Sequence, residues 1–236
     1  MITTHGCVTG GRRSLGQTGF SLIELLVVMG IIGILTVLSM QGFLAVTRGS
    51  SLTAAGQFLR DGLEFARQTA ESKNSTVEVR IYQLPANASS TPTDYRAFQI
   101  FLKGGQTTPV YTAVTKITYL PQPIVLSTDA TKTTFLNLTY VNTGGQTVNQ
   151  PVPGATPPAG AAAVSLPVYG TNYNYLYFCY TPSGGTNLPP PPPASNQWFA
   201  TLVPKNSPLI AGNGVPSDFV TVIIDPALGN ARLFHP

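Results

Sequence analysis

The longest uninterrupted apolar segment of the chain lies near its N-terminus, from residue 20 to residue 47. Glu24 is its only charged side chain. A helix over these 28 residues, at about 1.5 Å per residue, is roughly 40 Å long, which exceeds the roughly 30 Å hydrocarbon core of a bilayer. Arg12 and Arg13 precede the segment and favour a cytoplasmic N-terminal end, with the rest of the chain outside. The pattern predicts a single-pass membrane segment over residues 20–47.

After this segment the apolar residues recur every three or four positions. The spacing predicts an amphipathic helix over residues 48–74 that ends near Asn74 and packs under a globular domain. The side chains that we expect in the core are Leu52, Ala55, Phe58, Leu59, Leu63, Phe65, Ala66 and Ala70.

The polar side of this helix carries two pairs of opposite charges, each at a spacing of four residues. Arg60 is followed by Glu64, and Arg67 is followed by Glu71. Residues four apart are neighbours on a helix surface, so both pairs are predicted to form ion pairs worth a few tenths of a kcal/mol each.

From residue 75 to residue 236 the pattern is that of short strands. Val77, Val79 and Ile81 alternate with polar residues, which predicts a strand with one buried face. Further strands are predicted within residues 95–105, 116–120, 124–127, 134–141, 173–187, 197–203, and in a terminal hairpin at 220–224 and 231–234.

Two segments rich in Pro and Gly interrupt these strands, at residues 142–167 and 188–195. We expect the first to be a long surface loop and the second to be a stiff connection biased toward polyproline II. The expected fold class is α+β: a long N-terminal helix packed on an antiparallel β-sheet domain.

The composition agrees with an extracytoplasmic, loop-rich β domain more than with a cytoplasmic enzyme. Charged residues are 9% of the chain, against roughly 25% in ordinary soluble domains. The formal charge is +4, and 11 basic against 9 acidic residues leave +2 without Arg12 and Arg13. No segment clusters basic and aromatic residues, and only Lys205 and Arg232 are basic near the C-terminal end, which argues against a nucleic-acid partner.

A secretory signal peptide is one interpretation of residues 20–47. Two features oppose it, because the segment is longer than an h-region of about 7 to 15 residues and no A-x-A-like cleavage site follows before Arg48. A plain membrane anchor is a second interpretation. An anchor has no use for Glu24, whose burial at the centre of a membrane helix costs about 2.5 to 3.5 kcal/mol.

The segment "GFSLIELLVVMGIIGIL", residues 19–35, resembles the N-terminal signature of type IV prepilins and type II secretion pseudopilins. The resemblance implies that a prepilin peptidase and methyltransferase removes residues 1–19, cutting after Gly19, and then methylates the new amino group of Phe20. It also implies a role in assembly for Glu24, whose carboxylate would meet the amine of Phe20 in a neighbouring subunit. The helix over residues 20–47 would serve first as an inner-membrane anchor and later as a filament core.

Two further stretches narrow this resemblance. "LRDGLEFARQTAESKNSTVEV", residues 59–79, and "VTVIIDPALGNARL", residues 220–233, are similar to the GspH/FimT group of minor pseudopilins. A pilin-like fold is implied, together with other pilin-like subunits and the secretion assembly platform as partners. The resemblance places the chain in the bacterial inner membrane with its C-terminal domain in the periplasm, and then in a periplasmic pseudopilus or a surface pilus.

Three functions stay open on this basis. The first is a minor pseudopilin of a type II secretion pseudopilus that supports protein export. The second is a minor pilin of a type IV pilus for adhesion or DNA uptake. The third is a membrane-anchored binding protein that does not polymerise.

The residues that carry enzyme chemistry are sparse. The two histidines are His5, in the expected leader, and His235, next to the C-terminal end of the sequence. Asp218 and Asp225 are possible cation ligands, although Asp225 before Pro226 is typical of a turn. We therefore expect no catalytic residues, no cofactor and no metal site.

Smaller residues add two expectations. Cys179 is expected to be a small buried hydrophobe, because Cys7 would leave with the leader. Gly30, Gly33 and Gly42 either loosen the first helical half or let it pack closely against other helices.

Overall fold

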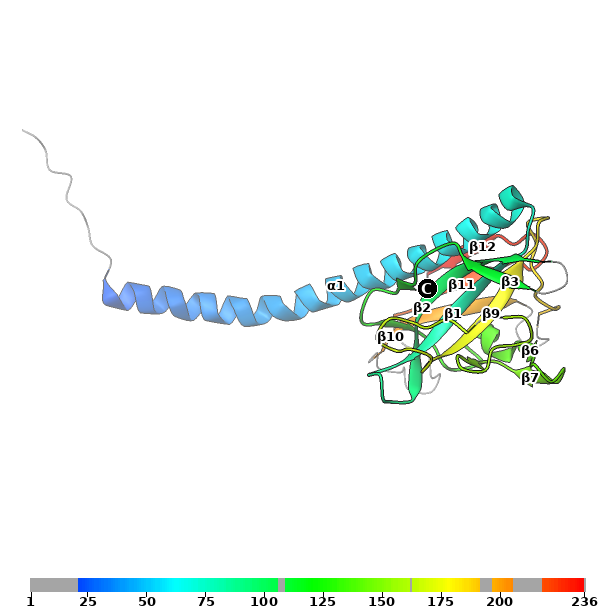
Figure 1. Cartoon of the computed structure of the whole chain (residues 1–236). Helices are drawn as coiled ribbons and strands as arrows, with labels where there is room; N and C mark the ends of the chain where they lie inside the picture. Colours follow the sequence, from blue (N-terminus) through cyan, green and yellow to red (C-terminus); the bar gives the residue numbers. More distant parts are fainter. Residues whose placement is uncertain (1–20, 106–108, 162, 192–196, 206–217, 236) are drawn as a thin grey trace, which may run out of the picture. The chain divides into compact units, whose positions relative to one another are not determined.

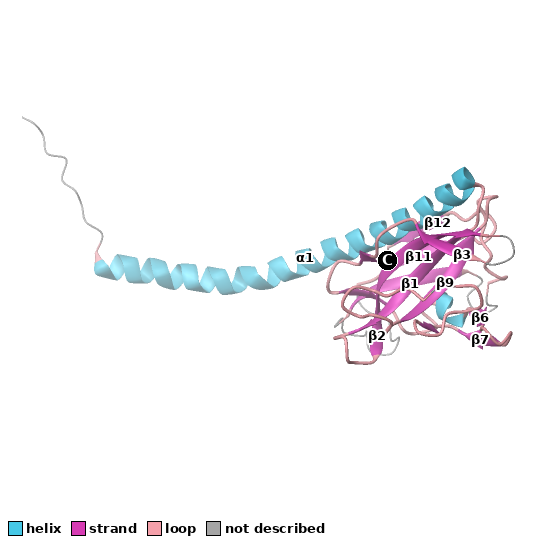
Figure 2. Cartoon of the chain, in the orientation of Figure 1, coloured by secondary structure: helices cyan, strands magenta, loops and turns pink. Residues whose placement is uncertain are grey.

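The computed structural model describes residues 21–105, 109–161, 163–191, 197–205 and 218–235, without the side chains of residues 38–46 and 48. The chain forms two compact units, Met1–Ala45 and Val46–Pro236. Helix α1, Leu22–Lys73, supplies residues to both. In the second unit, the C-terminal part of α1 lies along a β-sheet (Figures 1 and 2).

The end of α1 agrees with the predicted boundary at Asn74. Asn74 adopts a left-handed conformation with φ +46°. Its amide donates to the Glu71 carbonyl at 3.3 Å, and the Ser75 amide donates to the Ala70 carbonyl at 3.1 Å. These two bonds satisfy carbonyls of the last turn in the manner of a Schellman motif, in which Asn is one of the few residues tolerated at the left-handed position.

The sheet is antiparallel throughout its described strands. Its order is β12-β11-β10-β5-β2-β1-β9-β8, and β3 and β4 also pair with β2. The strands are β1 Val77–Pro85, β2 Pro92–Gly104, β3 Val110–Ala113, β4 Thr118–Tyr119, β5 Ile124–Leu126, β8 Val152–Pro153, β9 Asn174–Tyr180, β10 Trp198–Pro204, β11 Val220–Ile224 and β12 Ala231–Phe234. A separate two-stranded ladder joins β6, Thr139–Val141, to β7, Thr147–Asn149. The α+β prediction is confirmed.

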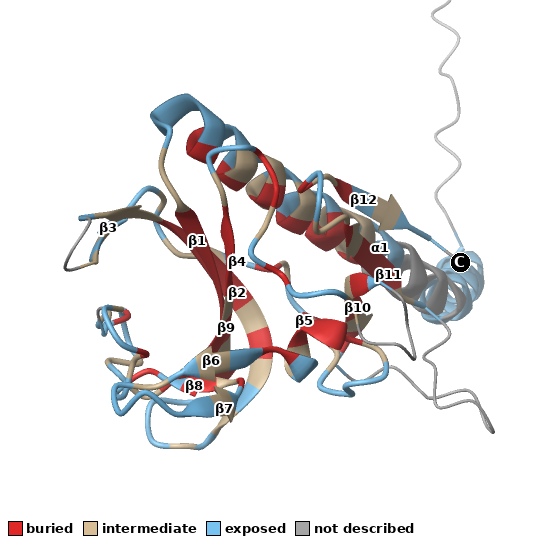
Figure 3. Cartoon of the chain, turned by 90° about the vertical axis from the view of Figure 1, so that its right-hand side faces the viewer, coloured by how far each residue is buried: buried red, intermediate tan, exposed pale blue. Residues whose placement is uncertain are grey.

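The main core lies between α1 and the sheet, where Figure 3 shows buried residues on both elements. Six of the eight helical residues predicted in the core form a buried stripe from Leu52 to Ala70, in which none is more than 5% exposed: Leu52, Ala55, Leu59, Leu63, Ala66 and Ala70. Val77, Val79 and Ile81 of β1 meet it from the sheet. Trp198 of β10 is also buried there and stacks at 6.0 Å on Phe135.

The placement of two aromatic residues of α1 differs from the prediction. Phe58 is 51% exposed and Phe65 is 44% exposed, so neither belongs to the core. A helix turns about 100° per residue, which places both side chains roughly 100° or more from the middle of the buried stripe. Their helical position outweighs their hydrophobicity.

One of the two predicted ion pairs of α1 forms and the other does not. Arg67 Nε lies 3.3 Å from the Glu71 carboxylate. Arg60 instead contacts its neighbour Asp61 at 2.7 Å. Glu64 is drawn toward the terminal hairpin, where its carboxylate accepts a hydrogen bond from the Ala231 amide at 2.8 Å.

The prediction that β1 buries only one face is wrong. Glu78 is 1% exposed and Arg80 is 0% exposed, although both stand on the face opposite α1. A second, smaller core covers that face, built around Tyr82, Leu84, Val152, Leu166, Tyr173 and Tyr175. The alternation in the sequence therefore marks two different cores, one apolar and one aromatic and polar.

The Pro- and Gly-rich segment 142–167 contributes to this second core and is not only a surface loop. Val152 and Leu166 within it are buried. The adjoining run 134–141, predicted as a strand, begins with a short 3₁₀ helix, Thr134–Asn137, before β6. Of the second Pro-rich segment, residues 192–195 lie outside the described residues, and the carbonyl of Pro189 accepts a hydrogen bond from Trp198 Nε1 at 2.8 Å.

The outer edge of β9 is closed by three different partners. β8 pairs with Tyr175. The side-chain amide of Gln150 donates to the Tyr177 carbonyl at 2.9 Å and accepts from the Tyr177 amide at 2.6 Å. Asn187 pairs with Cys179: its side-chain oxygen accepts from the Cys179 amide at 2.7 Å, and its backbone amide donates to the Cys179 carbonyl at 2.9 Å. Because unpaired strand edges template association with other chains, these contacts remove one route to unwanted sheet growth.

Candidate functional site: an exposed apolar helix with one carboxylate

The beginning of α1 is set by Ser21. The Leu25 amide donates to the Ser21 carbonyl at 3.1 Å, which places Ser21 at the N-cap and Glu24 at the third helical position. Ser followed three residues later by Glu is the pattern of a capping box. Within the described residues, however, the Glu24 carboxylate has no hydrogen bond or ion pair, and the residue is exposed. The carboxylate is therefore available to another group.

Around Glu24 the helix presents apolar side chains in every direction. Twelve large hydrophobic residues between Leu22 and Val37 are 46–82% exposed. Contiguous apolar surface of this kind is rare on soluble monomers and marks a surface that contacts lipid or another protein. Gly30 and Gly33 lie within it, and no atom lies within 4 Å of a Cβ built at either position.

Gly19 and Phe20, the predicted cleavage and methylation residues, lie outside the described residues. The pairing of the Phe20 amine with Glu24 stays a prediction. Over the described residues, no helical segment has both the length and the mean hydropathy of a membrane span.

A polar network joins α1 to the terminal hairpin inside the second unit. Arg67 Nη1 donates to the Asn230 side-chain oxygen at 2.6 Å and lies 3.6 Å from Glu64. Glu64 in turn binds the Ala231 amide. Because both charged residues are only about a third exposed, this network fixes the hairpin against the helix without creating an open site.

The buried pair of Glu78 and Arg80 is enclosed by aromatic rings. Their side chains meet at 2.5 Å, and the Arg80 guanidinium lies 4.3 Å from the Phe101 ring centre and 5.0 Å from that of Tyr175. Burial raises the pKa of Glu78, against the opposing effect of the Arg80 charge. Neither side chain is accessible to a substrate, so the pair is an internal support for the second core.

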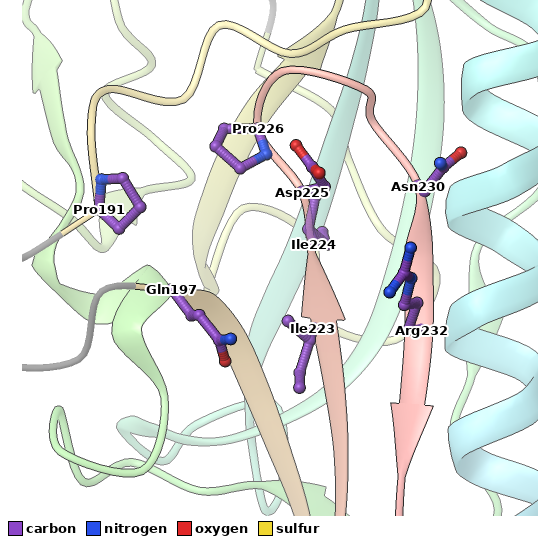
Figure 4. A pocket seen from close by; sticks show the side chains of 8 residues that line it. All are labelled: Pro191, Gln197, Ile223, Ile224, Asp225, Pro226, Asn230 and Arg232. Carbon is purple, nitrogen blue, oxygen red and sulfur yellow. The ribbon is translucent and has the colours of Figure 1, made fainter.

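Hollows lined by described residues lie at two places on the surface of the second unit. One, of about 260 Å³, lies beside the terminal hairpin and is shown in Figure 4, with Asp225 and Arg232 among its lining residues. Asp225 is a turn residue, as predicted, because its carboxylate accepts hydrogen bonds from the Ala227 and Leu228 amides at 2.9 and 3.1 Å. The other hollow, of about 390 Å³, lies near Arg96 and Tyr119.

The described residues contain no group of three or more His, Cys, Asp or Glu side chains arranged to hold a metal ion. Cys179 is buried, as expected, and burial raises the pKa of its thiol to about 12. Asp218 is exposed and belongs to no such group among the described residues.

Residues 15–40 match the model of a protein family, the prokaryotic N-terminal methylation motif. The chain carries a prepilin-type N-terminus. The match spans Gly19, Phe20, Glu24 and most of the exposed apolar helix, and it bears out the predicted prepilin-like character. Type IV pilin-like subunits and pseudopilins are the proteins to which this N-terminus is similar.

Two solved structures were found, both of the minor pseudopilin EpsH from the type II secretion system of Vibrio cholerae. Each is 14% identical to this chain. The alignments cover 96% of each of those chains and 80% and 79% of this chain, with TM-scores of 0.40 and 0.39. No curated protein matched the chain.

Proposed function

We propose that the protein is a minor pseudopilin, a structural subunit that joins a filament of pilin-like proteins through α1 and supports protein export by a type II secretion system. The observation that carries the proposal is the exposure of twelve large apolar side chains around Glu24 in a segment that matches the methylation motif. Lipid would cover this surface before assembly, and neighbouring helices would cover it afterwards.

The proposed processing follows from the sequence around the start of α1. Cleavage after Gly19 removes residues 1–19 and gives Phe20 a free amine, which is then methylated. Glu24 stands four residues further along, near the positive end of the helix dipole. In the filament its carboxylate pairs with the Phe20 amine of the adjacent subunit, and the burial of two opposite charges sets the axial register more than it adds stability.

Residues 20–47 anchor the chain in the inner membrane before assembly, with the N-terminus in the cytoplasm and residues 48–236 in the periplasm. Partners in this scheme are the prepilin peptidase and methyltransferase, the secretion assembly platform and other pilin-like subunits. Catalysis has no part in it. The exposed Phe58 and Phe65 support an assembled state, because large aromatic side chains on a helix gain free energy when a neighbour covers them.

A minor pilin of a surface type IV pilus is the second candidate, because the same motif serves both assemblies. The two differ in what is lost when the gene is deleted. Loss of an exported protein from the medium, with surface pili intact, supports the pseudopilin. Loss of adhesion or DNA uptake with normal export would instead identify a pilin.

Processing is tested by mass spectrometry of the protein purified from membranes. We expect an N-terminal peptide that begins at methylated Phe20. An intact Met1, or a first residue beyond Val46, would contradict the prepilin assignment. A Gly19→Ser variant is expected to retain residues 1–19, which ties the cleavage to this position.

Assembly is tested by Glu24→Gln, which removes the charge and keeps the size of the side chain. We expect normal insertion and cleavage but several-fold less protein in sheared or crosslinked filaments. Asp61→Asn is the matched control, because Asp61 is an exposed acid on the same helix outside the motif. Equal incorporation of the Glu24→Gln and Asp61→Asn variants would show that the glutamate has no role in assembly.

A further inference from the structure

The hollow of about 390 Å³ in the second unit is walled by four segments that are distant in sequence. Arg96 comes from β2 and Tyr119 from β4, while Tyr169 and Lys205 lie in connections that follow β8 and β10. Its volume falls within the range of about 300 to 1,000 Å³ that is usual for small-molecule sites. Leu120 and Ile124, both buried, give it an apolar floor.

Arg96 supplies a positive charge that no carboxylate among the described residues neutralises. Its Nη2 donates to the Pro85 carbonyl at 2.6 Å and to the Tyr169 hydroxyl at 2.9 Å, and its guanidinium lies 5.7 Å from the centre of the Tyr169 ring. All of these partners are uncharged. The Nε atom is buried and has no hydrogen-bond partner among the described residues. These contacts hold the guanidinium in place without cancelling its charge.

Tyr169 is held on Arg96 by a tight turn. Leu166 and Gly170 exchange two backbone hydrogen bonds of 2.8 and 2.9 Å, and Val168 between them adopts φ +72° while 79% exposed. A β-branched residue in the left-handed region costs about 1 to 3 kcal/mol and persists only where its surroundings impose it. The strain is local to the turn that sets Tyr169 over the guanidinium.

The remaining polar groups of the hollow add hydrogen-bond donors. Lys205 uses one of its three N–H groups on Asp94, at 2.6 Å, and is 48% exposed. Tyr119 is 45% exposed. Burial is the main cause that raises the pKa of Tyr119, so its hydroxyl is a donor at neutral pH. Asp94, the one carboxylate of the lining, is already engaged by Lys205.

We propose that this hollow binds a carboxylate-bearing ligand, with Arg96 and the Tyr119 hydroxyl on the carboxylate and the apolar floor under an adjoining hydrophobic group. Nη2 is engaged by Pro85 and Tyr169 and Nε is buried, so the Nη1 end of the guanidinium is the one that donates to the carboxylate, in a hydrogen bond between two charged groups. One unneutralised cation suits a monoanion better than a phosphate dianion. Both a small organic acid and a polypeptide, through its C-terminus or an acidic side chain, carry such a carboxylate, and the test below distinguishes these two sources.

The test uses the full chain in detergent micelles and saturation-transfer difference NMR with three probes. They are benzoate, N-acetylphenylalanine and the neutral N-acetylphenylalanine amide. We expect signals from one or both acids and at least tenfold weaker binding of the amide, because a hydrogen bond to a charged group is worth about 1.5 to 3 kcal/mol. Binding of N-acetylphenylalanine alone assigns the site to polypeptide carboxylates, whereas equal binding of benzoate assigns it to small acids.

Variants separate this site from general attraction by a basic protein or by micelles. Arg96→Gln is expected to weaken binding of the acid about tenfold and Tyr119→Phe about threefold. Lys132→Gln, which removes a lysine outside the hollow, is expected to have no effect. If circular dichroism shows that Arg96→Gln does not fold, Tyr119→Phe decides the matter. The proposal is overturned if neither acid binds, if the amide binds as well as the acid, or if the folded Arg96→Gln or Tyr119→Phe variant binds like the wild type.

Discussion

Two segments of α1 both carry many apolar residues but differ completely in the exposure of those residues. Between Leu22 and Val37 the large apolar side chains are 46–82% exposed, whereas in the stripe from Leu52 to Ala70 none is more than 5% exposed. The second segment places its apolar residues on one face, which a single sheet can cover. The first has them on all sides, and one sheet cannot cover a helix all round.

One part of the helix is therefore buried by contacts within the chain, whereas the apolar surface of the other part is left for lipid or another protein to cover. The buried stripe gains its free energy from packing on β1, β10 and β11 within the same unit. The exposed segment has no such contacts among the described residues, and its single carboxylate has no partner there either. Stability of the second unit therefore depends on the later part of the helix, and the earlier part is the one to which we ascribe assembly in the proposed function.

The largest expected effect is a difference in the free energy of unfolding when leucine is replaced by alanine in each of the two segments. Leu63→Ala should lower the free energy of unfolding by about 2 to 5 kcal/mol, because a buried leucine leaves a cavity. Leu26→Ala, at a side chain 64% exposed, should leave it unchanged. Fluorescence of Trp198, the only tryptophan and buried in the second unit, reports unfolding of that unit in the full chain. Equal losses for the two variants would abolish the distinction between the segments.

Glycines provide a second matched pair. A Cβ at Gly62 would meet the ring of the core residue Phe98, whereas a Cβ at Gly33 would meet nothing within 4 Å. Gly62→Ala should therefore destabilise the second unit by about 1 to 3 kcal/mol through overpacking. Gly33→Ala should not affect the Trp198 transition. Filament incorporation of the same variant is a separate measurement, and a loss there would mean that Gly33 is needed for close packing between helices.

The sequence was sufficient to predict the buried stripe, the end of α1, most strands and the prepilin-type N-terminus. These features depend on local patterns of period 3.6 or 2 and on one dense motif. The exposure of Phe58 and Phe65 was within reach of the same reasoning. Their angular position on the helix already separates them from the stripe, and hydrophobicity alone gave the wrong expectation.

The second core and the Arg96 hollow had no comparable signal. The polar alternation at Glu78 and Arg80 normally marks an exposed face, but rings from Phe101, Tyr111 and Tyr175 enclose the pair. The covering residues follow β1 by some 20 to 100 positions. No pattern within one segment announces which distant loop will cover a strand. The four segments around Arg96 are separated in the same way.

A smaller effect is expected from two arginines of α1. Arg67→Ala should cost about 1 to 2 kcal/mol, because it removes the hydrogen bond to Asn230 and leaves Glu64 without its cation. Among the described residues, Arg60 forms an ion pair only with its exposed neighbour Asp61, so Arg60→Ala should change the free energy of unfolding by less than about 0.5 kcal/mol. Denaturant unfolding followed at Trp198 gives both values. The reverse order would mean that the terminal hairpin is not held to the helix by this network.

The most local expectation concerns the thiol of Cys179, studied in a Cys7→Ser background. Burial raises its pKa from an ordinary value near 9 to about 12, so the folded protein keeps the thiol neutral. Its contribution to stability is fully present below the unfolded pKa and is lost as the pH rises from about 9 toward 12.

Reaction of Cys179 with a thiol reagent at pH 8 should therefore proceed only as fast as the second unit opens. A Phe58→Cys thiol, placed at a position that is 51% exposed in the same unit, should react many times faster in the Cys7→Ser, Cys179→Ala background. Leu63→Ala should accelerate the Cys179 reaction and leave the Phe58→Cys reaction unchanged, because only the buried thiol depends on opening of the core. Comparable rates for the two thiols would mean that the outer edge of β9, closed by Gln150 and Asn187, opens far more readily than its hydrogen bonds indicate.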